Sequence, residues 1–204
     1  MARYTGPKVK ISRRLGVNIY ENAKGDRALE RRPFPPGEHG HARRRQPSEY
    51  LLQLQEKQKA KYIYGVLEKQ FANTYKEANR AKGVTGENLL RMLEQRLDNI
   101  VYRAGWAATR PQARQFVNHG FVNVNGRRLD IASYRAKLGD VISLRDKHRE
   151  SIVIRHNIDT LDRITPAWLN KGDGGFEVTV QDLPTRAQID VPVREQLIVE
   201  LYSK

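Results

Sequence analysis

The chain has 204 residues, with 37 lysines and arginines against 23 aspartates and glutamates, which gives a formal net charge of +14. This balance favours a polyanionic partner, and nucleic acid is the usual one. The chain has no cysteine, which excludes disulfides, thiolate metal sites and cysteine nucleophiles. It has no 18-residue apolar stretch and no signal-peptide pattern that would point to a membrane or to secretion.

The positive charge is unevenly distributed and divides the chain into parts. Residues 1–47 carry a net charge of +8 and residues 94–155 a net charge of +6, whereas residues 156–204 carry −3. We therefore expect the positive field to lie at the start of the chain and around residues 94–155. The mildly acidic last part suits packing against the chain itself or against a protein.

The first 47 residues are poorly suited to forming an independent core. They contain the turn-rich run Arg32-Pro33-Phe34-Pro35-Pro36-Gly37, and their composition predicts an extended or partly disordered arm that becomes ordered on RNA. Tyr4, Tyr20 and Phe34 lie among the charges, where they either stack on bases and sugars or pin the arm to the protein.

From Ser48 onward the apolar spacing becomes helical. Ser48 can cap a helix from Glu49 to about Tyr64, and a second helix is expected over 66–82. Thr85 can cap a third helix, and a short fourth helix is expected over 98–103.

The segment 109–120, TRPQARQFVNHG, has the signals of a short helix with a cationic face. Thr109 and Gln112 have the spacing of a capping box, and Gly120 ends the helix. The helical spacing separates two groups of residues, a core-facing stripe of Ala113, Phe116 and Val117 and a polar face of Arg110, Arg114 and Asn118.

The residues that follow have the pattern of a β-hairpin. Residues 122–124 alternate as in a strand, Asn125-Gly126 is the strongest short signal for a hairpin turn, and Arg127 and Arg128 begin the returning strand. Two arginines of the helix and two of the hairpin would form one cationic patch for the backbone of folded RNA. The alternative is an ordinary solvated helix and hairpin.

The remaining residues alternate between strand and helix patterns. Residues 129–155 become strand-like again, most clearly at 141–144, and another strand is expected from Phe176 to Val180. The apolar spacing from Val193 to Tyr202 predicts a final helix.

Several of these segments resemble the alpha-L RNA-binding fold of several RNA-handling families: RLDNIVYRAG at 96–105, TRPQARQFVNHG at 109–120, VNVNGRRLDIASY at 122–134 and GDVISLR at 139–145. Flanking segments narrow the resemblance to the family of bacterial ribosomal protein number four of the small subunit. They are ARYTGPK near the start, PPGEHG at 35–40, EYLLQLQEKQKAKYIYGVLEKQF at 49–71, TGENLLRMLEQRLDN at 85–99 and QLIVELYSK at the end. The resemblance covers essentially the whole chain in order.

The resemblance implies an α+β fold, in which an alpha-L domain of short helices packed on a small antiparallel sheet is inserted in a helical domain with an extended basic arm. The implied parts are an extended basic arm over 1–47, a helical domain over 48–93 that is completed by 156–204, and an alpha-L RNA-binding domain over 94–155. The resemblance implies a structural constituent of the small ribosomal subunit, in the cytoplasm, that is not an enzyme. The implied role is that of a primary binder of ribosomal RNA that docks at a multi-helix junction of the 5′ domain, nucleates assembly of the subunit body and contributes to translational accuracy. The implied partners are small-subunit ribosomal RNA, the fifth small-subunit ribosomal protein and, by proximity, the messenger entry channel, with no cofactor and no membrane.

The motif and the resemblance together give three groups of expected RNA-binding residues. The alpha-L group consists of Arg103, Thr109, Arg110, Gln112, Arg114, Gln115, Asn118, His119, Asn125, Gly126, Arg127, Arg128, Tyr134 and Lys137. The helical-domain group consists of Tyr50, Gln53, Lys57 and Lys61. The arm group, which would thread between RNA helices, consists of Arg3, Tyr4, Lys8, Lys10, Arg13, Arg14, Arg43, Arg44 and Arg45. Replacing both Arg110 and Arg114 with alanine is expected to weaken RNA binding by roughly 1–3 kcal/mol.

The chain departs from the family at two points. Many members carry an N-terminal cysteine cluster for zinc, and because this chain has no cysteine we expect a metal-free arm. His39 and His41 alone are weak evidence for a metal site. Phe121 stands where a polar residue, often histidine, is common, so no RNA contact is expected there.

Two other classes of protein compete with this interpretation. The alpha-L fold also occurs in enzymes such as pseudouridine synthases and an aminoacyl-tRNA synthetase, but the chain has no P-loop, GxGxxG motif after a strand or HExxH motif. Asp98 and Asp140 lack matching partners as catalytic carboxylates. A duplex-DNA binder would need a helix-turn-helix or a zinc finger, and neither is evident.

Overall fold

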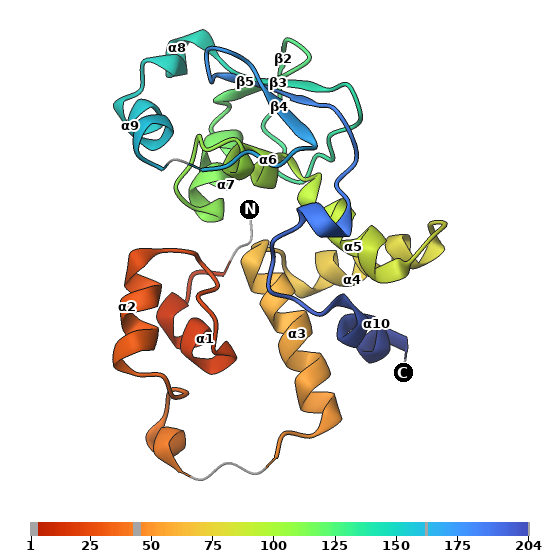
Figure 1. The fold of residues 1–204 in the computed structure, drawn as a ribbon. Helices are drawn as coiled ribbons and strands as arrows, with labels where there is room; N and C mark the ends of the chain where they lie inside the picture. Colours follow the sequence, from red (N-terminus) through yellow and green to blue (C-terminus); the bar gives the residue numbers. More distant parts are fainter. Residues whose placement is uncertain (1–3, 43–45, 162, 204) are drawn as a thin grey trace. The chain divides into compact units, whose positions relative to one another are not determined.

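The computed structural model describes residues 4–42, 46–161 and 163–203 (Figure 1). The chain forms two units, one made of residues 1–86 and 192–204 and the other of residues 87–191. Arg3 and Arg43 to Arg45, which are expected to bind RNA, lie outside the described residues.

The first unit is built of helices. They are α1 (Lys8–Leu15), α2 (Ala23–Arg31), the 3-10 helix η1 (Glu38–His41), α3 (Glu49–Ile63), α4 (Glu68–Arg80), the start of α5 (Thr85–Glu94) and α10 (Glu195–Ser203). The Ser48 hydroxyl accepts a hydrogen bond from the Leu51 N–H at 3.3 Å, which confirms the predicted cap of α3. The other helices that the sequence predicts in this part are also present.

The N-terminal segment differs from the extended arm that its composition predicts. Helices α1 and α2 contact each other, and the Asn22 side chain caps α2 by accepting a hydrogen bond from the Gly25 N–H at 2.7 Å. The Arg13 guanidinium donates to the Phe34 carbonyl at 3.1 Å, which holds the turn-rich run against α1. Hydrogen bonds between side chains and backbone, local at Asn22 and longer-range at Arg13, order a segment that carries little apolar periodicity.

The C-terminal helix α10 packs on α3. Gln53 donates from Nε2 to the Glu200 carboxylate at 3.0 Å, and the Tyr202 ring stacks on Tyr75 with centroids 4.5 Å apart. Residues 192–204 therefore belong to the first unit, although more than a hundred residues separate them from it in sequence.

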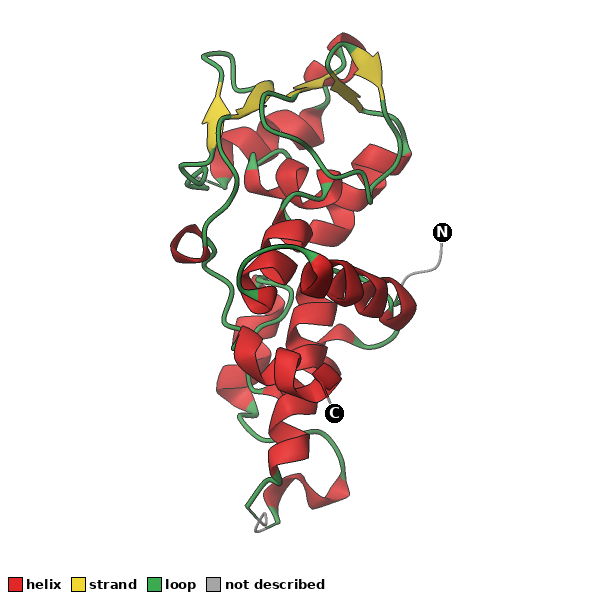
Figure 2. Ribbon diagram, turned by 90° about the vertical axis from the view of Figure 1, so that its right-hand side faces the viewer, coloured by secondary structure: helices red, strands yellow, loops and turns green. Residues whose placement is uncertain are grey.

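The second unit is a small sheet with helices α6 and α7 on one side; the strands appear in yellow in Figure 2. The strands are all antiparallel and lie in the order β2-β1-β3-β5-β4. Alternate strand residues, among them Val122, Ile142 and Val178, are buried against α6 and α7. The elements are α6 (Leu97–Arg103), α7 (Arg110–Asn118), β1 (Val122–Val124), β2 (Arg127–Arg128), β3 (Val141–Leu144), α8 (Asp146–Arg149), α9 (Ile152–Thr160), β4 (Leu169–Lys171), β5 (Glu177–Val180) and the 3-10 helix η2 (Arg186–Gln188).

The division of the chain differs from the one that the family resemblance implies. Strands β4 and β5 extend the sheet through the pairing of β5 with β3, so residues 156–191 fold with the second unit and only 192–204 return to the helices. Helices α8 and α9 occupy part of the region where strand-like patterns were expected. The α+β class and the helical and RNA-binding parts are as predicted.

Candidate nucleic-acid interface

The hairpin between β1 and β2 has the turn that its sequence predicts. Asn125 has a φ of 50° and Gly126 a φ of 76°, the pair of positive values that a type I′ turn requires. The Asn125 amide also donates to the Asp140 carboxylate at 2.9 Å, and its oxygen accepts from the Val141 N–H at 2.8 Å. The side chain of Asn125 therefore anchors the turn to the neighbouring loop.

Asp140 is the centre of this anchor. Its carboxylate also accepts hydrogen bonds from the Tyr134 hydroxyl and from the Lys137 N–H, each at 2.8 Å. Burial acts to raise the pKa of Asp140, but these hydrogen bonds and the Lys137 charge outweigh it and lower the pKa. The carboxylate is consequently ionised at neutral pH and holds the hairpin tip and the 134–140 loop together.

The anchored tip presents cations to solvent. Arg127, Arg128 and Lys137 are all exposed, and the nearest carboxylate oxygen of Asp130 lies 3.8 Å from the Arg128 guanidinium. The Arg128 guanidinium lies against Gly120, so closely that a Cβ at that position would collide with it. Arg128 is thus held beside the C-terminal end of α7.

Helix α7 begins and ends where the sequence predicts. The Thr109 hydroxyl accepts from the Gln112 N–H at 3.4 Å, while the Gln112 side chain reaches back to the Ala108 N–H at 2.7 Å rather than to that of Thr109. Gln115 and His119 are exposed and Asn118 is half-buried. Gln115 and His119 therefore lie on the solvent-exposed side of α7, and contact of all three side chains with RNA stays a prediction.

The two arginines of α7 are buried rather than exposed. Arg110 donates from Nε to the Asn99 amide oxygen at 2.9 Å, and Arg114 lies 3.4 Å from the Asp98 carboxylate. Arg96 bonds the same carboxylate at 3.1 and 2.8 Å. The cationic face of α7 therefore lies against α6, and contact of Arg110 and Arg114 with RNA stays a prediction.

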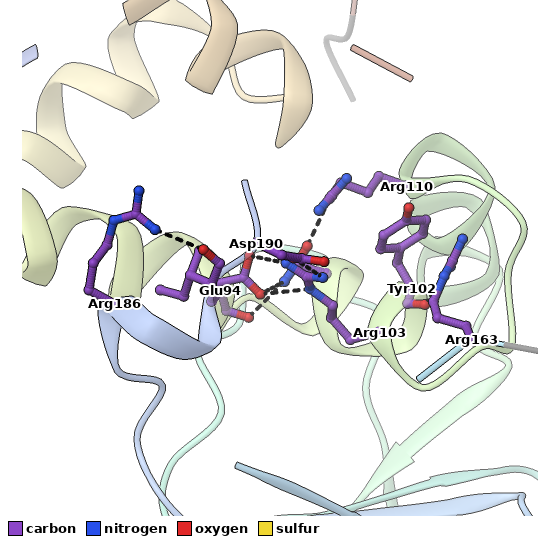
Figure 3. Close-up of polar contacts among 9 residues, drawn as sticks. Glu94, Tyr102, Arg103, Arg110, Arg163, Arg186 and Asp190 are labelled. Atoms are coloured by element: carbon purple, nitrogen blue, oxygen red, sulfur yellow. Dashed lines mark hydrogen bonds and ion pairs between the residues drawn. The ribbon is translucent and has the colours of Figure 1, made fainter. Parts of the chain in front are cut away.

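Arg103, another predicted RNA ligand, is buried and lies in an ion cluster with the buried Glu94 and the exposed Asp190 (Figure 3). It bonds both carboxylate oxygens of Glu94 at 3.0 Å and lies 2.6 Å from Asp190. Burial acts to raise the pKa of Asp190, but the charge and hydrogen bond of Arg103 outweigh it and lower the pKa. Arg103, at the end of α6, thus holds both Glu94 at the end of α5 and Asp190 in place.

Beside this cluster, the Tyr102 ring lies between two guanidinium groups (Figure 3). The guanidinium carbon of Arg110 is 4.3 Å from the ring centroid and that of Arg163 is 3.7 Å away. Arg163 also donates to the carbonyls of Tyr102 and Ala107 at 2.8 and 3.1 Å. These cations stabilise the α6 region through cation–π contacts and hydrogen bonds within the fold.

In the helical unit, the predicted ligands Lys57 and Lys61 share an internal partner. Their ammonium groups lie 2.8 and 3.2 Å from the Glu68 carboxylate, which also accepts from the Tyr202 hydroxyl at 3.0 Å. Burial acts to raise the pKa of Glu68, but these three partners lower it. Of the helical-domain group, Tyr50 is the most exposed.

The predicted arm residues include both exposed cations and anchoring aromatics. Lys8, Lys10 and Arg14 are exposed. The Tyr4 ring meets Tyr62 of α3 edge-on with centroids 5.3 Å apart, which favours the alternative that the arm tyrosines pin the segment to the protein.

Within the described residues no group of three or more histidines, aspartates and glutamates could hold a metal ion. Among the helices of the same residues, none is long and apolar enough to cross a membrane.

Comparison with known proteins identifies the family. The ribosomal protein S4/S9 N-terminal domain matches residues 3–94, and the S4 domain matches residues 95–142. Small ribosomal subunit protein uS4 of Nocardioides sp. (strain ATCC BAA-499 / JS614) is 57% identical over 207 residues, which cover 100% of both chains. The chain belongs to the uS4 family of small ribosomal subunit proteins. The uS4 proteins of Rhodococcus opacus (strain B4) and Corynebacterium jeikeium (strain K411) are 57% and 55% identical over 205 residues, again covering 100% of both chains.

Membership of the uS4 family confirms the sequence-based resemblance and excludes the enzyme alternative. The chain is a ribosomal protein of the small subunit with an RNA-binding S4 domain. The matched S4 domain contains the anchored hairpin and α7, and it ends at residue 142.

The RNA-binding residues expected from the sequence do not include a basic group just beyond the S4 domain. Arg145, Lys147 and Arg149 follow β3, and His148 among them stacks on Phe121 with ring centroids 3.8 Å apart. The signal in the sequence is the run LRDKHRE, in which alternate residues are basic.

Proposed function

We propose that the chain is a primary binder of small-subunit ribosomal RNA that docks at a multi-helix junction of the 5′ domain and nucleates assembly of the subunit body. The observation that carries this proposal is the hairpin of the S4 domain, which Asp140 anchors and which presents Arg127 and Arg128 to solvent. Such a rigid cationic tip suits an RNA backbone because its charges are positioned before binding.

The exposed residues around the tip have complementary tasks in this proposal. Arg127, Arg128 and Lys137 contact phosphates, which position the RNA without reading its sequence. Gly126 allows close approach of the backbone N–H groups, and Gln115 and His119 bond sugars or base edges.

Other members of the predicted group act on RNA by holding the fold. Arg103, Arg110 and Arg114 fix α6 and α7 through Glu94, Asn99 and Asp98. Asn125 and Tyr134 hold the hairpin through Asp140. Thr109 and Gln112 cap α7.

The helical unit supplies further RNA contacts in the same proposal. Exposed Lys8, Lys10 and Arg14 bind phosphates from the N-terminal segment, and Tyr50, Lys57 and Lys61 do so from α3. Each of these two lysines reaches a phosphate by exchanging its contact with Glu68.

We also propose, from the family resemblance, contact with the fifth small-subunit ribosomal protein, a position near the messenger entry channel and a contribution to translational accuracy in the cytoplasmic ribosome. The start of α3 supports a protein contact, since Leu51 and Leu52 are exposed by 40% and 41%. Large apolar side chains clustered on one exposed turn are typical of a protein interface.

The test of RNA binding replaces Arg127 and Arg128 with glutamine in the full chain. Binding to a 5′-domain fragment of ribosomal RNA should weaken roughly tenfold to a hundredfold, and the salt slope should fall by about 2. The control replaces Lys76 and Arg80 of α4, which are also exposed and change the net charge equally. If the two double variants bind alike, the hairpin tip is not a phosphate contact and binding depends on net charge alone.

A further inference from the structure

Helix α8 is fixed against the end of α7 by contacts from both its backbone and its side chains. The Arg145 N–H donates to the Phe121 carbonyl at 2.9 Å, and its guanidinium donates to the Gly120 carbonyl at 3.1 Å. The His148 ring stacks on Phe121 at 3.8 Å, and Phe121 stacks on Phe116 of α7 at 5.2 Å. The position of α8 is therefore set by the same residues that end α7.

This arrangement continues the cationic surface of the hairpin. Gly120 contacts Arg128 on one side and Arg145 on the other, so both guanidinium groups lie at one end of α7. Lys147 and Arg149 extend the charge along α8. His119, which is exposed, meets the edge of the same Phe121 ring.

The carboxylates near α8 offset part of its charge, but among the described residues they leave Lys147 without an ion pair. Asp146 lies 3.1 Å from Arg149, whose Nε also donates to the Leu144 carbonyl at 3.1 Å. Lys147 is exposed, and within the described part of the chain its ammonium has no hydrogen bond or ion pair. Glu150 ends the basic run and is also exposed.

His148 is built into this surface as an uncharged ring. Burial, followed by the charges of Lys147 and Arg145, lowers its pKa. A neutral imidazole stacked on a phenyl ring forms a flat support between cations, which is the combination that stacks and neutralises a nucleic-acid strand.

We propose that Arg145, Lys147, His148 and Arg149, the α8 surface, form a further RNA-binding surface that continues the hairpin surface beyond the S4 domain. The proposal rests on the proposed binding of small-subunit ribosomal RNA. The ligand is the sugar-phosphate backbone of the strand that leaves the hairpin tip. Lys147 contacts phosphate directly, and Arg145 positions α8 through Gly120.

The charges favour RNA over a protein as the occupant. The α8 surface is continuous with Arg128 and polar throughout, whereas a protein contact would be expected on the adjacent start of α9, where Ile152 and Val153 are exposed by 84% and 49%. The two surfaces are separable by substitution because their side chains belong to different helices.

The first experiment compares Lys147→Glu with Lys76→Glu in the full chain, which match in charge change and exposure. With a 5′-domain fragment of ribosomal RNA, Lys147→Glu should weaken binding about fivefold to tenfold and lower the salt slope, whereas Lys76→Glu should change affinity by under about twofold. Specific binding by the unaltered chain with equal effects of the two variants would overturn the α8 proposal alone. Loss of specific binding by the unaltered chain would instead overturn the proposed function.

The second experiment measures acetylation of lysine side chains by a water-soluble reagent, with and without the RNA fragment. RNA should protect Lys147 and leave Lys76 reactive. If RNA leaves Lys147 as reactive as Lys76, while assembled subunits protect it, the α8 surface binds a protein and the proposal is wrong.

Discussion

At the scale of single residues, the arginines of the S4 domain divide by burial into two tasks. Arg96, Arg103 and Arg114 are buried and bond the buried carboxylates Asp98 and Glu94. A buried carboxylate requires such partners, because desolvation of an unpaired charge costs several kcal/mol. Arg127 and Arg128 lie outside this network and are available to solvent.

The two tasks predict that the same substitution lowers stability strongly at one arginine and hardly at the other. Arg103→Ala leaves Glu94 without its bidentate partner and should lower the free energy of unfolding by about 3–5 kcal/mol. Arg128→Ala should change it by less than about 0.5 kcal/mol. Urea unfolding followed by circular dichroism measures both, and equal losses of stability would contradict the division.

The sequence could predict the grouping of these residues but not their burial. Helical spacing correctly placed Ala113, Phe116 and Val117 in the core and Arg110 and Arg114 together on another face. Spacing does not reveal that a second helix covers that face. The available signal was Asp98-Asn99 within the otherwise apolar helix α6, since buried polar groups need cationic or hydrogen-bonding partners.

At the scale of elements, local chemistry was predictable and tertiary packing was not. The cap at Ser48, the cap at Thr109 and the Asn125-Gly126 turn depend on neighbouring residues, and all three are present. Strand β4, over 169–171, has three residues and no alternation to mark it. Its pairing with β5 depends on the sheet already in place.

Two glycines with positive φ, Gly126 after β1 and Gly120 after α7, make it possible to distinguish the effect of backbone strain from the effect of displacing Arg128. Gly126 has a φ of 76° with open space around it, and Gly120 has a φ of 69° with Arg128 against it. Each change to alanine should cost about 1–2 kcal/mol of stability through the left-handed backbone. Only Gly120→Ala should displace Arg128, and so it should weaken RNA binding more than Gly126→Ala in a filter assay. The reverse order of affinities would show that the contact of Arg128 with Gly120 has no role in binding.

The anchor of the hairpin should make stability depend on pH. Because the folded pKa of Asp140 is lowered from its usual 3.8, its contribution is complete above that value and is lost as pH falls through the folded pKa. Asp140→Asn should therefore be less stable than the unaltered chain by about 1–3 kcal/mol at pH 7. The difference should shrink in unfolding titrations below the usual pKa of aspartate. A difference that stayed constant down to acid pH would show that the carboxylate charge does not hold the hairpin.

At the scale of the whole molecule, net charge pointed to the partner better than to the domain boundaries. A net charge of +14 over 204 residues predicted a polyanion, and membership of the uS4 family agrees. The charge of −3 in residues 156–204 agreed with the assignment of this part to the helical domain that the resemblance implied, yet 156–191 belong to the sheet unit. Charge indicates which surfaces face solvent or a ligand. The boundary between the two units depends instead on the pairing of strands β3 and β5.

The central claim is that the whole chain recognises ribosomal RNA specifically and does not merely bind polyanions. Filter binding to a 5′-domain fragment of small-subunit ribosomal RNA, competed with tRNA and with duplex DNA at physiological salt, tests it most directly. We predict tight binding that survives an excess of both competitors. Equal displacement by tRNA, duplex DNA and the unlabelled fragment would contradict the claim, because it would leave net charge as the only source of affinity.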